Sequence, residues 1–164
     1  MKVPKRYIPP TLTRKNKRKQ ARALQKSRKL YKRGIYYTRP AIASFRTRKS
    51  DHVTKAKQLY SVDSITPSKA LARATGCSVD ALRRIVRKGE GAYFSSGSRP
   101  SQTAQSWGIA RLASAISGGK SAAVDYAILE KGCNHRGPAF KLARKSRTVH
   151  GYGHAKTPSV SVDL

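Results

Sequence analysis

The chemistry that this sequence offers most of is the binding of anions by Lys and Arg side chains. The chain has 36 Lys and Arg residues against seven Asp and Glu residues, a formal net charge of +29 over 164 residues. Twenty of these cations and a single acid, Asp51, lie in residues 1–60. A compact chain of this charge repels itself unless an anionic partner neutralises it. The sequence therefore predicts nucleic acid, an acidic protein surface or an anionic membrane face as the partner.

The cations expected to meet this partner fall in two groups, one before residue 34 and one within residues 83–88. The first group is Arg14, Lys15, Lys17, Arg18, Lys19, Arg22, Lys26, Arg28, Lys29, Lys32 and Arg33, and the second is Arg83, Arg84, Arg87 and Lys88. Both groups present charges that suit phosphate or carboxylate oxygens.

The second group belongs to a segment, residues 68–88, with the spacing of a helix-turn-helix. Ala72 is small enough for two helices to cross closely, and Gly76 permits the turn between them. In a DNA reader of this kind the second helix enters the major groove, where its cations contact phosphates and guanines. We favour the alternative interpretation, a capped helical hairpin whose basic face is merely solvated.

Aromatic side chains are interleaved with the cations of the first 60 residues. Such interleaving suits the stacking of bases from single strands or RNA. It equally suits the anchoring of an arm in grooves between protein subunits, where Tyr and Arg are favoured contacts. The expected anchors are Tyr7, Tyr31, Tyr36, Tyr37 and Phe45, with Tyr60 following them.

The acids and nucleophiles of the chain do not form a catalytic pattern. Glu90, Asp125 and Glu130 are scattered, and no local signature of a nucleophile with its base is present. Cys133 and the histidines after it do not favour zinc, because Cys133-x-His135 is tight for chelation. We therefore predict no enzymatic activity, no metal, no cofactor and no small-molecule substrate.

The cysteine content indicates the redox environment. Cys77 and Cys133 are the only cysteines, which is too few for a disulfide framework. We expect two small buried thiols in a reducing compartment. No run approaches the roughly 18–20 apolar residues that span a membrane, and the start of the sequence lacks the apolar region of a secretory signal.

These side chains must be positioned by helices, because no convincing alternating strand pattern is present. The longest helix is predicted over residues 13–33, which contain no Pro or Gly and stop at Gly34. Like charges crowd this helix, so we expect it to fold only on a partner. Residues 1–10 contain three prolines and are predicted to be extended.

Further helices are predicted where caps and glycines delimit apolar faces. A short one starts after Ser50, and the others span about residues 66–75, 78–88, 102–117 and 121–131 and a segment after Pro138. Residues 89–101, with three glycines, are predicted as a loop. The sequence thus predicts an all-α fold: a small body of about five short helices in residues 61–147, a long basic arm in residues 1–60 and an irregular extended tail in residues 148–164.

One segment is distinctive as a motif. Residues 91–129 read GAYFSSGSRPSQTAQSWGIARLASAISGGKSAAVDYAIL, and the start of the chain contains VPKRYIPPTLTRKNKRKQ and SRKLYKRGIYYTRP. We expect a rigid turn, in which Trp107 packs beneath the loop and Arg99 satisfies carbonyl or carboxylate oxygens. The alternative is a binding surface. The residues that define this loop are Tyr93, Phe94, Arg99, Pro100 and Trp107.

These stretches resemble a small basic protein encoded by large DNA viruses of algae, of the chlorovirus type. The resemblance covers nearly the whole chain and implies a viral origin and a place in the virus particle. It implies no catalytic residues, because that family has no established activity.

The resemblance favours two interpretations. The first is a minor capsid protein on the inner face of the virion shell, whose basic arm contacts capsid proteins or an anionic internal membrane face. The second is a genome-packaging protein that neutralises the phosphates of viral DNA. A ribosomal or other RNA-binding protein fits the composition as a further alternative. On sequence grounds the capsid interpretation is preferred.

Overall fold

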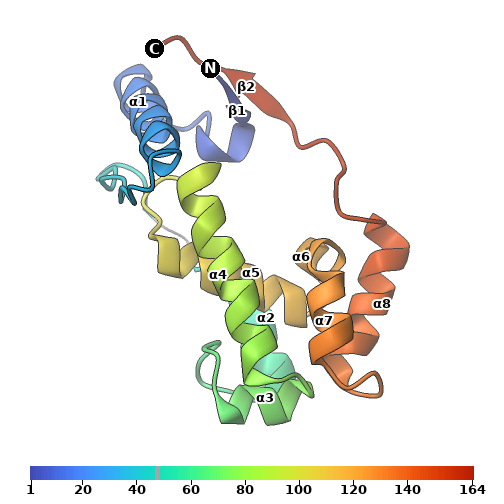
Figure 1. Ribbon diagram of the computed structural model, residues 1–164. Coiled ribbons are helices and arrows are strands. Elements are labelled where there is room, and N and C mark those ends of the chain that lie inside the picture. The colour runs from blue at the N-terminus through green and yellow to red at the C-terminus, as the bar shows by residue number, and fades with distance from the viewer. Residues whose placement is uncertain (47–48) are drawn as a thin grey trace. The chain divides into compact units, whose positions relative to one another are not determined.

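The computed structural model describes residues 1–46 and 49–164. These residues are mainly helical, as the sequence predicts (Figure 1). They form eight α-helices, one 3-10 turn and two short strands. In chain order the elements are β1 (Lys2–Pro4), η1 (Lys5–Tyr7), α1 (Arg14–Tyr31), α2 (Asp51–Tyr60), α3 (Lys69–Thr75), α4 (Val79–Ser95), α5 (Ala104–Ile116), α6 (Lys120–Val124), α7 (Tyr126–Gly132), α8 (Pro138–His150) and β2 (Ser159–Ser161).

The chain divides into two compact units, each built from segments that are distant in sequence. Unit 1 comprises residues 1–48, 90–107 and 156–164, and unit 2 comprises residues 49–89 and 108–155. The boundaries fall inside α4 and α5, so each of these helices contributes one end to each unit. This division differs from the linear arrangement of arm, body and tail that the sequence predicts.

Unit 1 gives the basic N-terminal residues an apolar core. Val3, Tyr7 and Ile8 are buried together with Ala21 and Leu24 of α1. Trp107 and Val160, from the two other segments of the unit, pack against this cluster. The predicted arm is therefore not confirmed, because residues 1–31 contribute buried side chains to a packed interior.

The tail of the chain takes part in this unit through a short sheet. Strand β2 pairs antiparallel with β1, with Val160 opposite Val3. The prediction that the sequence forms no strand is wrong here, because three-residue strands are too short to show an alternating pattern. Residues 159–161 are therefore a paired strand and not part of an irregular tail.

Helix α1 confirms the helix predicted over residues 13–33. The Thr13 hydroxyl accepts a hydrogen bond from the backbone N–H of Asn16 at 3.2 Å, which caps the first turn. The helix ends at Tyr31, and Gly34 follows with a φ of +74°. Its buried residues pack in the core of unit 1. This packing stabilises the helix beyond what the helix propensity of its residues provides.

Unit 2 is a helical body with one continuous core. Leu82 and Ile85 of α4 are fully buried, as are Leu112 and Ile116 of α5. Phe140 of α8 is almost fully buried in the same core. Helix α5 confirms the helix predicted over residues 102–117, and α8 confirms the one predicted after Pro138. The hairpin formed by α3 and α4, with Gly76 at a φ of +78° between them, confirms the predicted turn.

Two predicted helix boundaries are wrong. Helix α3 begins after Ser68, whose hydroxyl accepts the N–H of Leu71, rather than at Thr66. Helix α4 does not stop at Gly89 but continues to Ser95, so half of the predicted loop at residues 89–101 is helical. A Cβ on Gly89 would lie 2.6 Å from the Cα of Gly108, so this glycine serves close helix packing and not a C-cap.

The helix predicted over residues 121–131 is two helices, α6 and α7. The break falls at Asp125, whose side chain is buried. Its carboxylate accepts two hydrogen bonds from the guanidinium of Arg111, both 2.7 Å long, and lies 3.1 Å from the Lys88 ammonium. The helix break thus coincides with a buried ion-pair network, which the sequence pattern does not reveal.

Candidate nucleic-acid interface

The outward face of α1 concentrates positive charge. The helix holds nine Lys and Arg residues and no acid in 18 residues. At about 1.5 Å per residue its length is about 27 Å, which gives roughly one positive charge per 3 Å of axis. A strand of B-DNA carries one phosphate per about 3.4 Å. The charge spacing of α1 therefore matches that of a nucleic-acid backbone.

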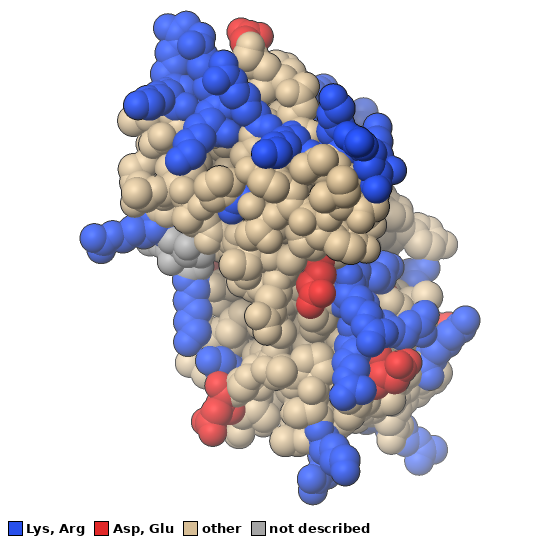
Figure 2. All heavy atoms as spheres, turned by 60° about the vertical axis from the view of Figure 1, so that its left-hand side comes forward, with Lys and Arg blue, Asp and Glu red and all other residues tan. Residues whose placement is uncertain are grey.

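Five of these cations form a continuous surface, here called the α1 furrow. They line a shallow depression of about 680 Å³ and are Arg14, Lys15, Arg18, Lys19 and Arg22. Their spacing of three and four residues places them in adjacent rows on one face of the helix. Figure 2 shows Lys and Arg side chains gathered on the upper part of the surface, where α1 lies in Figure 1.

No carboxylate neutralises the furrow within the described residues. The two ion pairs among the described residues both lie in unit 2, where Asp125 pairs with Lys88 and with Arg111. Like charges at this spacing destabilise a helix by a few tenths of a kcal/mol each. The five cations of the α1 furrow are thus free of ion pairs within the described residues, and an anionic partner would reduce their mutual repulsion.

The remaining predicted cations of the first group have different surroundings. The Arg28 guanidinium is tied down, because its Nε donates to the carbonyl of Ser96 at 2.8 Å. Lys26 places its ammonium 4.4 Å from the centre of the Tyr37 ring. The others are at least partly open to solvent and are Lys17, Lys29, Lys32 and Arg33.

A small pocket adjoins the furrow. It has a volume of about 220 Å³ and lies between α1 and the segment that contains Tyr37 and Pro40. Lys19 and Arg22 line both the pocket and the furrow. The full lining is Lys19, Gln20, Arg22, Ala23, Lys26, Tyr37, Pro40 and Ile42.

Arg39 holds this segment against α1. Its guanidinium donates hydrogen bonds to the hydroxyl of Ser27 (2.9 Å), the carbonyl of Tyr93 (2.7 Å) and the hydroxyl of Ser98 (2.8 Å). The guanidinium also lies 3.7 Å from the centre of the Tyr93 ring, and the Arg39 backbone N–H donates to the Tyr93 hydroxyl. One side chain thus joins the first two segments of unit 1, residues 1–48 and 90–107.

Arg39 is also the one Lys or Arg that is buried among the described residues, at 6% exposed. Burial lowers the pKa of its guanidinium from the ordinary value, and the nearby Tyr93 opposes this shift. Its polar atoms are nonetheless occupied, and Pro40 keeps it extended. We assign Arg39 a positioning role, because it fixes the wall of the pocket.

Three of the predicted arm anchors, Tyr7, Tyr36 and Phe45, contact residues of the chain's own motif segment. Tyr7 is 5% exposed and meets Trp107 edge-on, so it is not available as an anchor on another subunit. Tyr36 lies between Tyr31 and Phe94, with ring centres 6.1 Å and 5.2 Å away, yet it remains 71% exposed. Phe45 is half-buried, and its carbonyl accepts a hydrogen bond from Ser101.

The residues of the motif loop differ in their exposure, and the rigid turn expected there stays a prediction. Tyr93 and Pro100 are buried and Phe94 is half-buried, whereas Arg99 is exposed. The role predicted for Arg99, pairing with carbonyl groups, belongs to Arg39. Trp107 packs on Tyr7, as a member of the apolar cluster of unit 1.

The second predicted group of cations belongs to unit 2. Arg83, Arg84 and Arg87 are exposed on α4. Lys88 instead forms an ion pair with the buried carboxylate of Asp125 at 3.1 Å, so it belongs to the same ion-pair network as Arg111. The helical hairpin is present, and DNA reading by its second helix stays a prediction.

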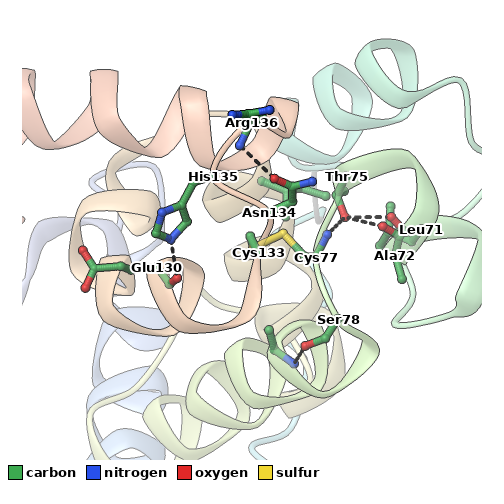
Figure 3. The surroundings of a disulfide bond; sticks show 12 residues. Leu71, Ala72, Thr75, Cys77, Ser78, Glu130, Cys133, Asn134, His135 and Arg136 are labelled. Atoms are coloured by element: carbon green, nitrogen blue, oxygen red, sulfur yellow. Dashed lines mark hydrogen bonds between the residues drawn. A yellow bond between two sulfur atoms is a disulfide. The ribbon is translucent and has the colours of Figure 1, made fainter.

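The two cysteines form a disulfide, which corrects the prediction of free thiols (Figure 3). Cys77 lies in the turn between α3 and α4, and Cys133 follows α7. They face each other across an isolated antiparallel bridge, with backbone hydrogen bonds of 2.7 Å on both sides. Counting cysteines argues against a framework of several bonds but not against a single one. The predicted reducing compartment loses its basis with the thiols.

Metal ligands do not converge in the described part of the chain. No three His, Cys, Asp or Glu residues come close enough there to hold an ion. Cys133 uses its sulfur in the disulfide, and the His135 ring is hydrogen-bonded to the carbonyl of Glu130 (Figure 3). Across residues 1–46 and 49–164, no helix has the length and apolar character needed to cross a membrane.

Sequence reasoning missed two residues of this region. Gln20 and Arg39 are buried, at 2% and 6% exposed, among neighbours of the same residue types that are exposed. For Gln20 the signal was its position on the apolar stripe of α1, one residue before Ala21 and four before Leu24. Nothing in the sequence separates Arg39 from the other arginines.

Comparison with known proteins gives one match. Residues 4–130 match a family of unknown function, DUF5824. No curated protein and no solved structure matches the chain. The matched region contains α1, the segment of Tyr37 and Arg39, and the motif loop. The chain belongs to this family of unknown function.

Proposed function

We propose that this protein binds nucleic acid through the α1 furrow and neutralises backbone phosphates without reading sequence. The observation that carries the proposal is the row of five cations on α1, to which no carboxylate is paired in residues 1–46 and 49–164. A rigid helix supports these cations, because its opposite face is packed in the core of unit 1. Binding of this type is driven by the release of counterions from the nucleic acid.

The biological setting we propose is the particle of a large DNA virus, in which the protein serves as a structural component that packages the genome. The resemblance of residues 91–129 and of the opening segments to chlorovirus-type proteins supports this setting. The packing of residues 1–31 within unit 1 favours genome binding over the capsid interpretation, because those residues are not an extended arm that reaches between subunits.

Contact with a capsid protein is a second candidate, and one observation favours it. Ile35 and Tyr36 are 46% and 71% exposed at the end of α1, beside the cations Lys32 and Arg33. Aromatic and basic side chains together are typical of protein interfaces. Cross-linking of purified particles distinguishes the two candidates, since capsid contact requires links from this segment to shell protein.

The direct test of the proposed function is salt-dependent binding to duplex DNA, measured by fluorescence anisotropy. In the test variant, Arg14, Lys15, Arg18, Lys19 and Arg22 are all replaced by Gln, which keeps good helix propensity. The matched control replaces five exposed cations of unit 2 by Gln: Lys69, Arg73, Lys131, Lys141 and Lys145. Circular dichroism verifies that both variants remain helical.

We expect the wild-type affinity to fall steeply with salt. The slope of log K against log salt concentration should become shallower by about 4 in the α1 variant, at about 0.9 per phosphate contact. The control variant should change the slope by less than about 1. An equal change in both variants would contradict a localised interface, and a wild-type chain without affinity at low salt would contradict the function.

A further inference from the structure

The pocket beside the α1 furrow has a composition that phosphate binding does not explain. Its lining includes the cations Lys19, Arg22 and Lys26, but it also includes the apolar residues Ala23, Pro40 and Ile42 and the aromatic residue Tyr37. At about 220 Å³ it is smaller than the pockets of about 300–1,000 Å³ that enclose drug-sized ligands. The space suits a single flat ring system rather than an extended molecule.

A buried amide without a partner lines the same pocket. Gln20 is 2% exposed, and its Nε2 has no hydrogen-bond partner within the described structure. An amide buried in this state is destabilising until a partner arrives. The Gln side chain offers two donors and one acceptor in a plane, which matches the polar edge of a nucleobase.

The cations of the lining place a phosphate next to such a ring. Lys19 and Arg22 belong to both the pocket and the furrow, so a backbone that follows the furrow passes the mouth of the pocket. The Lys26 ammonium, 4.4 Å from the Tyr37 ring centre, is the flexible end of an exposed side chain. A phosphate can draw it away and leave the ring free for stacking.

We propose that this pocket receives one unstacked nucleobase of a single strand, with Tyr37 as the stacking surface and Gln20 as the hydrogen-bonding group. The inference rests on the proposed function and deepens it, since it makes the protein prefer unpaired bases over backbone alone. It assigns Arg39 the task of holding Tyr37 and Pro40 against α1. Gln20 then gains on binding the partner that it lacks in the free protein.

The test compares a short oligo(dT) strand with an abasic strand of the same length, so that the number of phosphates is equal. We expect wild-type protein to bind the strand with bases about tenfold more tightly, the equivalent of about 1.4 kcal/mol and of one base–aromatic stack. Tyr37→Ala and Gln20→Leu should each remove most of this preference and leave affinity for the abasic strand unchanged. Tyr36→Ala is the matched control, because Tyr36 is exposed nearby but does not line the pocket.

Gln20→Leu separates a binding role from a structural one. Replacing an unpaired buried amide by an apolar side chain of similar size should leave the melting temperature unchanged or higher. Loss of base preference in a variant that is at least as stable as wild type supports the pocket. Equal wild-type affinity for both strands overturns the pocket but not the α1 furrow. Absence of binding to either strand overturns the proposed function and the pocket with it.

Discussion

Arg39 shows how a single side chain organises unit 1. Its guanidinium has no carboxylate partner in the described structure, yet three oxygens accept its hydrogen bonds and a Tyr ring lies over it. The planar fork of Arg fits this arrangement, whereas the Lys ammonium is a compact charge that cannot reach all three oxygens. The specific geometry, and not the charge, makes the residue structural.

We therefore predict that Arg39→Lys destabilises the protein by about 2–3 kcal/mol, because buried oxygens lose their donors. Urea denaturation measures the change. Arg99→Lys is the control, since Arg99 is exposed in the motif loop, and it should change the free energy of unfolding by less than about 0.5 kcal/mol. Equal stability of Arg39→Lys and wild type would show that the Arg39 contacts do not hold unit 1 together.

Tyr60 gives unit 2 a pH dependence in the alkaline range. Its hydroxyl donates to the carbonyl of Ile116, and burial raises the pKa of the phenol well above the ordinary value near 10. The unfolded chain therefore releases this proton at a lower pH than the folded chain does. The stability contributed by Tyr60 is complete below about pH 10 and falls as the pH rises above it.

The expected result is that wild type loses stability from pH 9 to 11 more steeply than Tyr60→Phe, by up to about 1.4 kcal/mol per pH unit. At neutral pH the Phe variant should be less stable by about 1 kcal/mol, because it lacks the hydrogen bond. Urea titrations at each pH measure both effects. Parallel pH curves for the two proteins would exclude Tyr60 as the group responsible.

At the scale of elements, Gly97 forms the junction between α4 and the rest of the motif loop. Its φ is +127°, a region that favours glycine. A Cβ at this position would lie 2.7 Å from a Leu24 methyl group and 3.0 Å from the Tyr7 ring. The turn thus packs directly on α1, and both its backbone and its lack of a side chain are required.

We predict that Gly97→Ala destabilises the protein by about 2–4 kcal/mol, from backbone strain and overpacking together. The matched control is Gly34→Ala, since Gly34 also has a positive φ, +74°, but a Cβ there meets nothing within 4 Å. The control should lose only about 1 kcal/mol, from backbone strain alone. Thermal unfolding distinguishes them, and equal losses would mean that the contact with Leu24 and Tyr7 is unimportant.

The predictable elements were those delimited by chemistry local to the sequence. The absence of Pro and Gly over residues 13–33 indicated α1, and Pro138 indicated the start of α8. Gly89 was wrongly predicted to end a helix. Its lack of a side chain instead allows close packing against Gly108, which is distant in sequence. The helix break at Asp125 was also missed, and the buried carboxylate of this residue pairs with Arg111, which is distant in sequence.

For the candidate site, the sequence indicated the cations of α1 but not the pocket beside them. Charge density is a property of composition, so the furrow could be found from Lys and Arg alone. The pocket depends on Gln20 and Tyr37 being brought together by Arg39, through contacts between segments that no periodicity encodes. Which individual polar residue is buried, when others of the same type are exposed, can be determined only from the tertiary structure.

At the scale of the whole molecule, the disulfide should make the two units respond differently to reducing agents. Cys77 and Cys133 belong to unit 2 and are 56 residues apart. Constraint of the unfolded chain over such a loop is worth about 4 kcal/mol in the chain-entropy account. Unit 1 contains no cysteine, so its own contacts do not include this bond.

Reduction should therefore accelerate amide hydrogen exchange in the core of unit 2, including α7 and α8, more than in α1. Exchange measured by mass spectrometry with and without reductant tests this prediction. Cys77→Ser with Cys133→Ser is the matching variant and should reproduce the pattern without reductant. Uniform acceleration in both units would show that they unfold as one cooperative body.

The division of unit 1 into three separated segments has a consequence for synthesis on the ribosome. Helix α1 emerges early, whereas β2, which pairs with β1, emerges about 130 residues later. At about 5–20 residues per second, the apolar stripe of α1 stays incompletely covered for on the order of ten seconds. During that interval the nascent chain displays its most cationic helix without its full packing, beside the polyanionic RNA of the ribosome that makes it.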